Sequence, residues 1–165
     1  MINFPGYKTN FEGESLFIKY YRMKKQQHFI KYKSVEVATK LLEAGENPNL
    51  KNSQGRNGLM ACSGRGWYYC MEKILKYITD INDRDNNGYT ALMHACSSID
   101  NIYSVRKLLE TGADPNIVSN NGDTALSISM DSGEVEYVKL IKKYIGRQNE
   151  IPINNVQSDN IELLI

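Results

Sequence analysis

Two histidines and three cysteines are the residues whose chemistry could support catalysis. His94 and Cys96 lie two positions apart in the stretch "YTALMHAC", and a Cys–His nucleophile would need their side chains to meet. On a helix, residues two apart point in different directions, so the pair predicts a core or surface histidine and not a catalytic dyad. His28 lies in a basic segment, and we expect its ring to be solvated.

Three other patterns resemble ligand sites but lack a required residue. The run "DINDRDNNG" at residues 80–88 has no glutamate at the twelfth position, where a calcium loop needs one, and is better explained as turn sequence. "SGRG" is too short for a phosphate loop and lacks its Lys-Ser/Thr, so we expect an inter-helix turn. The cysteines form no C-x-x-C pair and are predicted to be buried core residues. We therefore expect no catalytic residue, no cofactor and no metal site.

The composition is that of an ordinary soluble domain. The chain has 165 residues, of which 41% are hydrophobic and 24% charged, and its formal net charge is +1. No stretch is long and apolar enough for a membrane span, and the N-terminus lacks the layout of a signal peptide. We expect one intracellular domain, cytoplasmic or nuclear, with no membrane partner.

The elements that hold these residues recur along the chain. "NNGYTALMHAC" at 86–96 and "NNGDTALSIS" at 120–129 are nearly the same phrase. An asparagine also precedes each repeated glycine by six residues, and both markers are spaced by 33 and then by 34 residues. The marker pairs are Asn49 and Gly55, Asn82 and Gly88, and Asn116 and Gly122. Two markers that move together indicate an internal repeat.

Each unit reads as a finger, a short helix, a turn and a second helix. The segment after each repeated glycine has one apolar face, and a second amphipathic stretch such as "VEYVKLIKKYI" follows it. Gly45 and Gly112 are predicted to be left-handed caps of second helices. The linking segments are rich in Asn, Asp and Gly, as turns require.

"GYTALMHAC" and "KLLETGADPN" resemble the ankyrin-repeat pattern, as does "GDTALSISMDSGEVEYVKLI". The resemblance covers residues 34–145 and implies an all-α solenoid of about four stacked helix-turn-helix units with β-hairpin-like fingers. We expect a single domain over residues 1–147. Its repeats would span 14–48, 49–81, 82–115 and 116–147, followed by a C-terminal cap or tail at 148–165. The first repeat would be degenerate, with its first helix within 14–33.

The chain departs from the family pattern at several positions. The usual proline is Gly58, Ala91 or Ala125, and the usual histidine is Met60, Met93 or Ser127. The His-to-Thr hydrogen bond of the family should therefore be missing, and the helix that begins at Gly58 should be weak. Ile78 stands where a capping glycine is usual, and the third unit carries one extra residue, which we place in its inter-helix turn.

The resemblance implies a noncatalytic protein-binding module, a scaffold, adaptor or inhibitor, that docks a partner on its finger tips and concave helix face. Aromatic residues and arginine most often anchor such interfaces. Arg56, Tyr89, Trp67 and Tyr68 are the preferred anchors, although Trp67 and Tyr68 could instead pack the helix-turn corner and Arg56 could be solvated. The full set of candidate partner-binding residues is Lys51, Gln54, Arg56, Arg65, Trp67, Tyr68, Arg84, Asn87, Tyr89, Asn121 and Asp123.

Nucleic-acid binding is the alternative function. Segment 19–33, "KYYRMKKQQHFIKYK", alternates basic residues with aromatic residues that could stack on bases. The later repeats oppose it, because residues 80–136 carry ten acidic against three basic side chains. We expect a monomer that binds a protein. Its many residues with AT-rich codons favour a giant virus, a protist or an intracellular bacterium as the source, and the partner of a viral or bacterial protein would be a host protein.

Overall fold

The computed structural model describes residues 27–149, and side chains within residues 35–147. The described residues contain helices but no strand. The helices are α2 (Gln27–Glu43), α3 (Gly58–Ser63), α4 (Tyr68–Leu75), α5 (Ala91–Cys96), α6 (Ile102–Glu110), α7 (Ala125–Asp131) and α8 (Val135–Asn149). The all-α solenoid is confirmed, with fingers that are hairpin turns and not strands.

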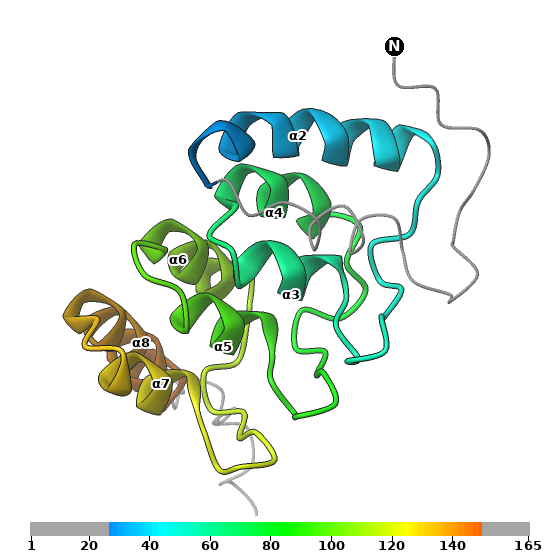
Figure 1. Ribbon diagram of the computed structural model, residues 1–165. Helices are drawn as coiled ribbons and strands as arrows, with labels where there is room; N and C mark the ends of the chain where they lie inside the picture. The colour runs from blue at the N-terminus through cyan, green and yellow to red at the C-terminus, as the bar shows by residue number, and fades with distance from the viewer. Residues whose placement is uncertain (1–26, 150–165) are drawn as a thin grey trace, which may run out of the picture.

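The helices form two rows, with the fingers projecting from one side of the stack (Figure 1). In the inner row α3 packs on α5, and α5 packs on α7. In the outer row α2, α4, α6 and α8 pack in the same order. Each inner helix also packs on the outer helix that follows it in the chain, so the three repeats with both helices described are helical hairpins stacked on their neighbours.

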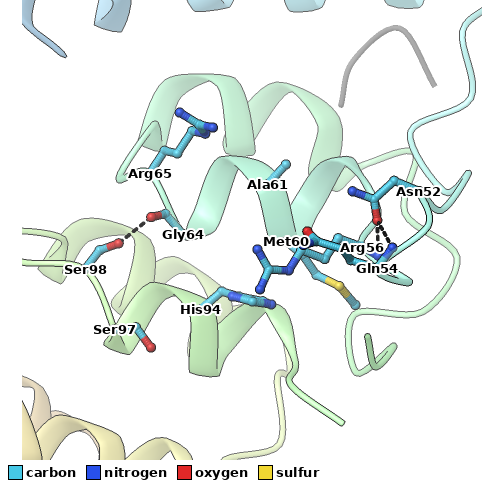
Figure 2. Close-up of a pocket in the computed structure, with 10 residues that line it drawn as sticks. All are labelled: Asn52, Gln54, Arg56, Met60, Ala61, Gly64, Arg65, His94, Ser97 and Ser98. Atoms are coloured by element: carbon cyan, nitrogen blue, oxygen red, sulfur yellow. Dashed lines mark hydrogen bonds between the residues drawn. The ribbon is translucent and has the colours of Figure 1, made fainter. Parts of the chain in front are cut away.

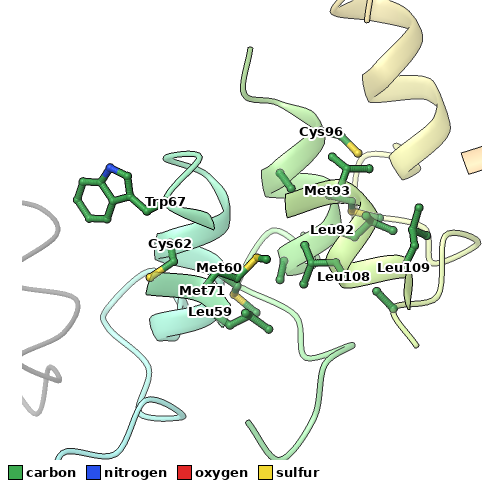
Figure 3. Close-up of a cluster of buried hydrophobic side chains, with 14 of the residues drawn as sticks. Leu59, Met60, Cys62, Trp67, Met71, Leu92, Met93, Cys96, Leu108 and Leu109 are labelled. Atoms are coloured by element: carbon green, nitrogen blue, oxygen red, sulfur yellow. The ribbon is translucent and has the colours of Figure 1, made fainter. Parts of the chain in front are cut away.

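A continuous apolar core fills the space between the two rows (Figure 3). Leu59, Leu92 and Ala125 come from the inner helices, and Met71 and Leu108 from the outer ones, and all are at most 1% exposed. Each repeat therefore buries its apolar face against the next, which is how solenoids obtain their stability.

Side-chain caps begin the three inner helices. Asn57, Thr90 and Thr124 occupy equivalent N-cap positions, and each side chain accepts the backbone N–H three residues on. The family's histidine bond is indeed absent at Met60 and Met93. In the last repeat Ser127 accepts the backbone N–H of Thr124 and completes a capping box, which the sequence analysis did not anticipate.

The turns between helices differ in length as expected. Four residues join α3 to α4 and five join α5 to α6, so the extra residue lies in the inter-helix turn. There Asp100 adopts φ 55°, a left-handed conformation that Gly66 supplies in the previous repeat with φ 65°. Gly45 and Gly112 are left-handed with φ 80° and 99° and cap α2 and α6, as predicted.

The first and last described helices are longer than the sequence analysis predicted. Helix α2 already begins at Gln27, so residues 27–33 belong to this outer helix and not to the first helix that we placed within 14–33. The rest of that segment, residues 14–26, and most of the predicted tail, residues 150–165, lie outside the described residues. At the C-terminal end, α8 continues to Asn149. Among residues 27–149, no helix is both long and apolar enough to cross a membrane.

Candidate functional site

The fingers are the segments before α3, α5 and α7, residues 49–57, 82–90 and 116–124, which we number second, third and fourth after their repeats. Hydrogen bonds join neighbouring fingers along their tips. The backbone N–H of Asn86 donates to Gln54 O at 3.0 Å, and that of Asn120 donates to Asn87 O at 3.0 Å. The side-chain amides of the same two asparagines donate to Ser53 O at 2.9 Å and to Asn86 O at 3.0 Å. The fingers thus form one ordered edge.

The predicted basic residues of the fingers reinforce this edge. Lys51 donates to Asp83 Oδ1 at 2.6 Å and to Arg84 O at 3.0 Å. Arg84 stands at the equivalent position one repeat later and donates to Val118 O at 2.9 Å. Lys51, Arg84 and Val118 occupy the same position in successive fingers. Each cation therefore bonds the backbone carbonyl of the residue that takes its place in the next finger. Their main described contacts lie within the stack.

Tyr89 has a similar role. Its hydroxyl donates to Asp123 Oδ2 at 2.6 Å, which joins the third finger to the fourth. Its half-buried ring lies 5.7 Å from the His94 ring, centroid to centroid. Two residues expected at a partner interface, Tyr89 and Asp123, therefore contact each other. Asn87 and Asn121 remain exposed at the finger tips.

The Asp85 carboxylate receives four hydrogen bonds within the fingers and α5, and it is only 1% exposed. Its Oδ1 accepts the backbone N–H groups of Asn87 and Tyr89 at 2.9 and 3.0 Å. Its Oδ2 accepts Arg56 Nε at 3.2 Å and lies 3.0 Å from His94 Nε2. Burial would raise the pKa of Asp85, but the hydrogen bonds from Tyr89, His94 and Asn87 outweigh it and hold the pKa below its usual value.

His94 is the neutral partner in this group. Burial and the nearby Arg56 guanidinium lower its pKa, and the Asp85 carboxylate offsets this only in part. An ionised carboxylate can only accept, so the proton of the neutral ring is on Nε2 and Nδ1 is an acceptor. His94 is therefore a buried structural histidine at the base of the second and third fingers.

The fingers and the inner helices α3, α5 and α7 form one surface, which we call the inner face. A hollow of ≈ 390 Å³ lies on this face, above the group of Asp85, Arg56 and His94 (Figure 2). It lies between the second finger, helices α3 and α5, and the turns that follow these helices. We call it the inner hollow; its lining residues are Asn52, Gln54, Arg56, Met60, Ala61, Gly64, Arg65, His94, Ser97 and Ser98. The hollow thus gathers three of the predicted residues, Gln54, Arg56 and Arg65.

The two arginines of the hollow are held from behind. Asp85 fixes Arg56 through Nε only, and within the described residues neither terminal nitrogen of Arg56 has a hydrogen-bond acceptor. The Arg65 guanidinium lies 5.3 Å from the centre of the Trp67 ring, a cation–π contact. Partial burial lowers the pKa of Arg65, but a guanidinium stays charged at neutral pH.

Trp67 and Tyr68 lie at the start of α4, at the corner between α3 and α4. Trp67 is 5% exposed and supports Arg65, so it offers little surface to a partner. Tyr68 is half-buried at the start of outer helix α4, with its ring 6.1 Å from that of Tyr103. Both pack the corner between the helices, and neither lines the inner hollow.

Sequence reasoning missed Asp85 and the contribution of His94 and Ser98 to the hollow. Asp85 occupies the same repeat position as Asn52 and Ser119, and each of these side chains accepts two backbone N–H groups within its own finger. That equivalence was visible in the sequence. The second role of Asp85 was not, because its bonds to Arg56 and His94 depend on how the repeats stack.

The described residues show no assembled catalytic group. Burial raises the pKa of the Cys96 thiol to about 11, so it is not a thiolate at neutral pH. The His94 ring is bonded to Asp85 and not to a nucleophile. Within residues 27–149, no three His, Cys, Asp or Glu side chains are grouped so that they could hold a metal ion.

The stacked hairpins, the fingers and the hollow between them are those of an ankyrin-repeat protein. A family model described as "Ankyrin repeats (3 copies)" matches residues 28–119, and the chain therefore belongs to this family. Proteins of the family are generally protein–protein interaction modules. No curated protein matches the chain closely enough to give it a more specific relative.

Proposed function

We propose that this protein is a noncatalytic binding module that docks a partner protein on its inner face, with the inner hollow as the centre of the contact. The observation that carries the proposal is the hollow itself. It is lined by an exposed Gln54, two arginines and the side chains of Met60 and Ala61, in a wall whose fingers are held by hydrogen bonds. A rigid, preorganised surface loses little conformational entropy on binding.

The role of each candidate residue follows from its place. Gln54, Arg56 and Arg65 contact the partner in the hollow, with Asn87 and Asn121 at the finger tips beside it. Lys51, Arg84, Tyr89 and Asp123 hold the fingers in register, and Trp67 positions Arg65. Tyr68 lies on the outer row and serves packing. The partner is a protein, and binding to a host protein would be the expected role in a viral or intracellular bacterial source.

Site-specific photo-crosslinking tests this proposal. A photoreactive phenylalanine analogue is placed at Gln54 or Ser97, which line the hollow, and at Tyr103 or Lys142, which are exposed on outer helices α6 and α8. In cells that contain the partner, we expect a defined protein adduct from the two inner positions and none from the outer ones. Adducts from the outer positions alone would contradict the proposal, as would their absence at all four.

The nucleic-acid alternative has no support in the described part of the chain. Residues 27–33 of segment 19–33 are in α2, and residues 19–26 lie outside the described residues. Binding of this segment to nucleic acid stays a sequence prediction. A full-length chain that binds no oligonucleotide at low salt would remove it.

A further inference from the structure

We infer that the inner hollow recognises an acidic segment of the partner, through carboxylates that pair with Arg56 and Arg65. This inference rests on the proposed function and adds the chemistry of the partner. Its first support is the charge of the lining. Of the ten described residues that line the hollow, two are arginines and none carries a carboxylate.

The Asp85 carboxylate leaves hydrogen-bonding capacity on Arg56. Asp85 is buried below the hollow and receives four donors, of which Arg56 contributes only Nε. With Asp85 included and His94 neutral, the group of Arg56, Arg65 and Asp85 has a formal charge of +2 − 1 = +1. A guanidinium with unpaired N–H groups in a partly enclosed site favours a carboxylate, which can accept two of them at once.

The equivalent positions in the other repeats show that this charge is local. The position of Arg56 is occupied by Tyr89 and then by Asp123 in the following repeats, at spacings of 33 and 34 residues. The position of Gly64, which lines the hollow, becomes Ser97 and then Asp131. The Arg56 position thus changes from basic at the second repeat to acidic at the fourth, and the Gly64 position changes from uncharged to acidic.

This change of charge along the stack indicates which repeats an acidic partner contacts. Carboxylates are attracted over the second and third repeats and repelled over the fourth, where Asp123 and Asp131 stand. Like charges brought together at an interface are a common source of specificity. An acidic segment is therefore placed in the inner hollow and excluded from the last repeat. A phosphate backbone would have the same attraction to the arginines, but its extended charge would also meet the acidic repeat.

Fluorescence anisotropy with defined peptides tests this inference on the full chain. The probes are labelled Gly/Ser peptides that carry two glutamates separated by one to four residues, and the same peptides with glutamine in their place. We expect at least one glutamate spacing to bind about tenfold more tightly than its glutamine version, with an affinity that falls as salt rises.

Two pairs of variants assign that binding to the hollow. Arg65→Ala should weaken binding of the glutamate probe about tenfold. Its control, Arg106→Ala, removes an exposed arginine from outer helix α6 and should leave binding unchanged. Should Arg65→Ala lower the melting temperature, Ala61→Glu and Ala61→Gln provide the second pair. They place side chains of the same size in the hollow, and only the glutamate should repel the probe.

The outcomes separate this inference from the proposed function. Equal binding of glutamate and glutamine probes, or equal binding by Arg65→Ala and the wild type, overturns the acidic-segment inference. Tighter binding of a single-stranded oligonucleotide that is lost in Arg65→Ala also overturns it. If crosslinks from Gln54 and Ser97 persist in any of these cases, the inner face still binds a protein, and only the chemistry assigned to the partner is wrong.

Discussion

Asp85 shows how one buried side chain can hold a binding surface together. It closes its own finger through two backbone N–H groups and fixes Arg56 of the preceding finger and His94 of α5. Each of these bonds joins groups that are distant in sequence or would otherwise be flexible. The orientation of Arg56 at the hollow therefore depends on a residue that no partner would touch.

Replacing this carboxylate should destabilise the fold. In Asp85→Asn, the new Nδ2 would face the N–H donors of Arg56 and His94, so we expect a loss of about 2–3 kcal/mol in the free energy of unfolding. Asp131→Asn, an exposed carboxylate in the last repeat, should change it by less than about 0.5 kcal/mol. Urea denaturation followed by circular dichroism measures both. Similar midpoints for the two variants would show that Asp85 does not hold the fingers.

The same pair predicts the pH dependence of stability. The pKa of His94 is lowered from 6.5 in the folded state, and that of Asp85 is lowered from 3.8. Protonation of either group therefore favours the unfolded chain. The His94 contribution is fully present above pH 6.5 and decreases as the pH falls below that value, followed by the Asp85 contribution below 3.8. His94→Gln keeps an N–H donor for Asp85 and should remove most of the first decrease in melting temperature. An unchanged pH profile in this variant would assign the decrease to other groups.

At the scale of elements, Tyr137 links the last outer helix to the turn between α5 and α6. Its ring is 1% exposed, and its hydroxyl donates to Ser98 O at 3.0 Å and accepts the N–H of Asn101. The Asn101 side chain continues the link by donating to Ser63 O at 2.8 Å. One chain of hydrogen bonds therefore joins α8, the turn between α5 and α6, and the end of α3, on the side of the hollow that is formed by Ser97 and Ser98.

Removal of the Tyr137 hydroxyl should loosen the turn between α5 and α6. Tyr137→Phe leaves a buried N–H and a carbonyl without their partner and should cost about 1–3 kcal/mol in the free energy of unfolding. Tyr103→Phe, with a ring that is 69% exposed, is the matched control and should be neutral. Hydrogen exchange gives a local readout, since the Asn101 amide should exchange faster in the first variant only. Equal protection in both would mean that Tyr137 only fills space.

The elements were largely predictable from the sequence, and their connections were not. Apolar periodicity and the repeated glycines located the helices and turns, including the additional residue before Asn101. Helix α2 was placed too short, because the basic residues before it hid its apolar periodicity. For the site, the sequence placed candidate residues on the fingers, and in the structure the expected anchors Tyr89 and Trp67 are bonded or buried within the stack. The Tyr89 hydroxyl bonds Asp123, which lies one repeat away, a distance over which sequence patterns do not specify side-chain orientation.

At the scale of the whole molecule, the second, third and fourth fingers pack one on another, and the fourth is the last among the described residues. A Cβ on Gly88 would lie 2.6 Å from Asn120 Oδ1 and 2.9 Å from Asn120 N of the next finger, and 2.5 Å from Nη2 of Arg84, the side chain that bonds the next finger. A Cβ on Gly122 would meet nothing within 4 Å among the described residues. Both glycines have left-handed backbones, with φ 78° and 87°.

These two glycines therefore separate backbone strain from packing between fingers. Gly122→Ala should cost only the left-handed strain, about 1–2 kcal/mol. Gly88→Ala should cost about 1–3 kcal/mol more, because Asn120 must move and its finger loses register. Thermal unfolding of both variants measures the difference. If the two melting temperatures coincide, the fingers do not pack on one another as described.

The most direct test of docking in the inner hollow is a map of binding by ¹H–¹⁵N NMR. The tightest glutamate probe is titrated into labelled protein. We expect the largest shift changes at the amides of Gly64, Arg65, Ser97 and Ser98 and at the Arg65 side-chain N–H, with little change along α6 and α8. Changes centred on the outer helices, or on the fourth finger around Asp123, would contradict it.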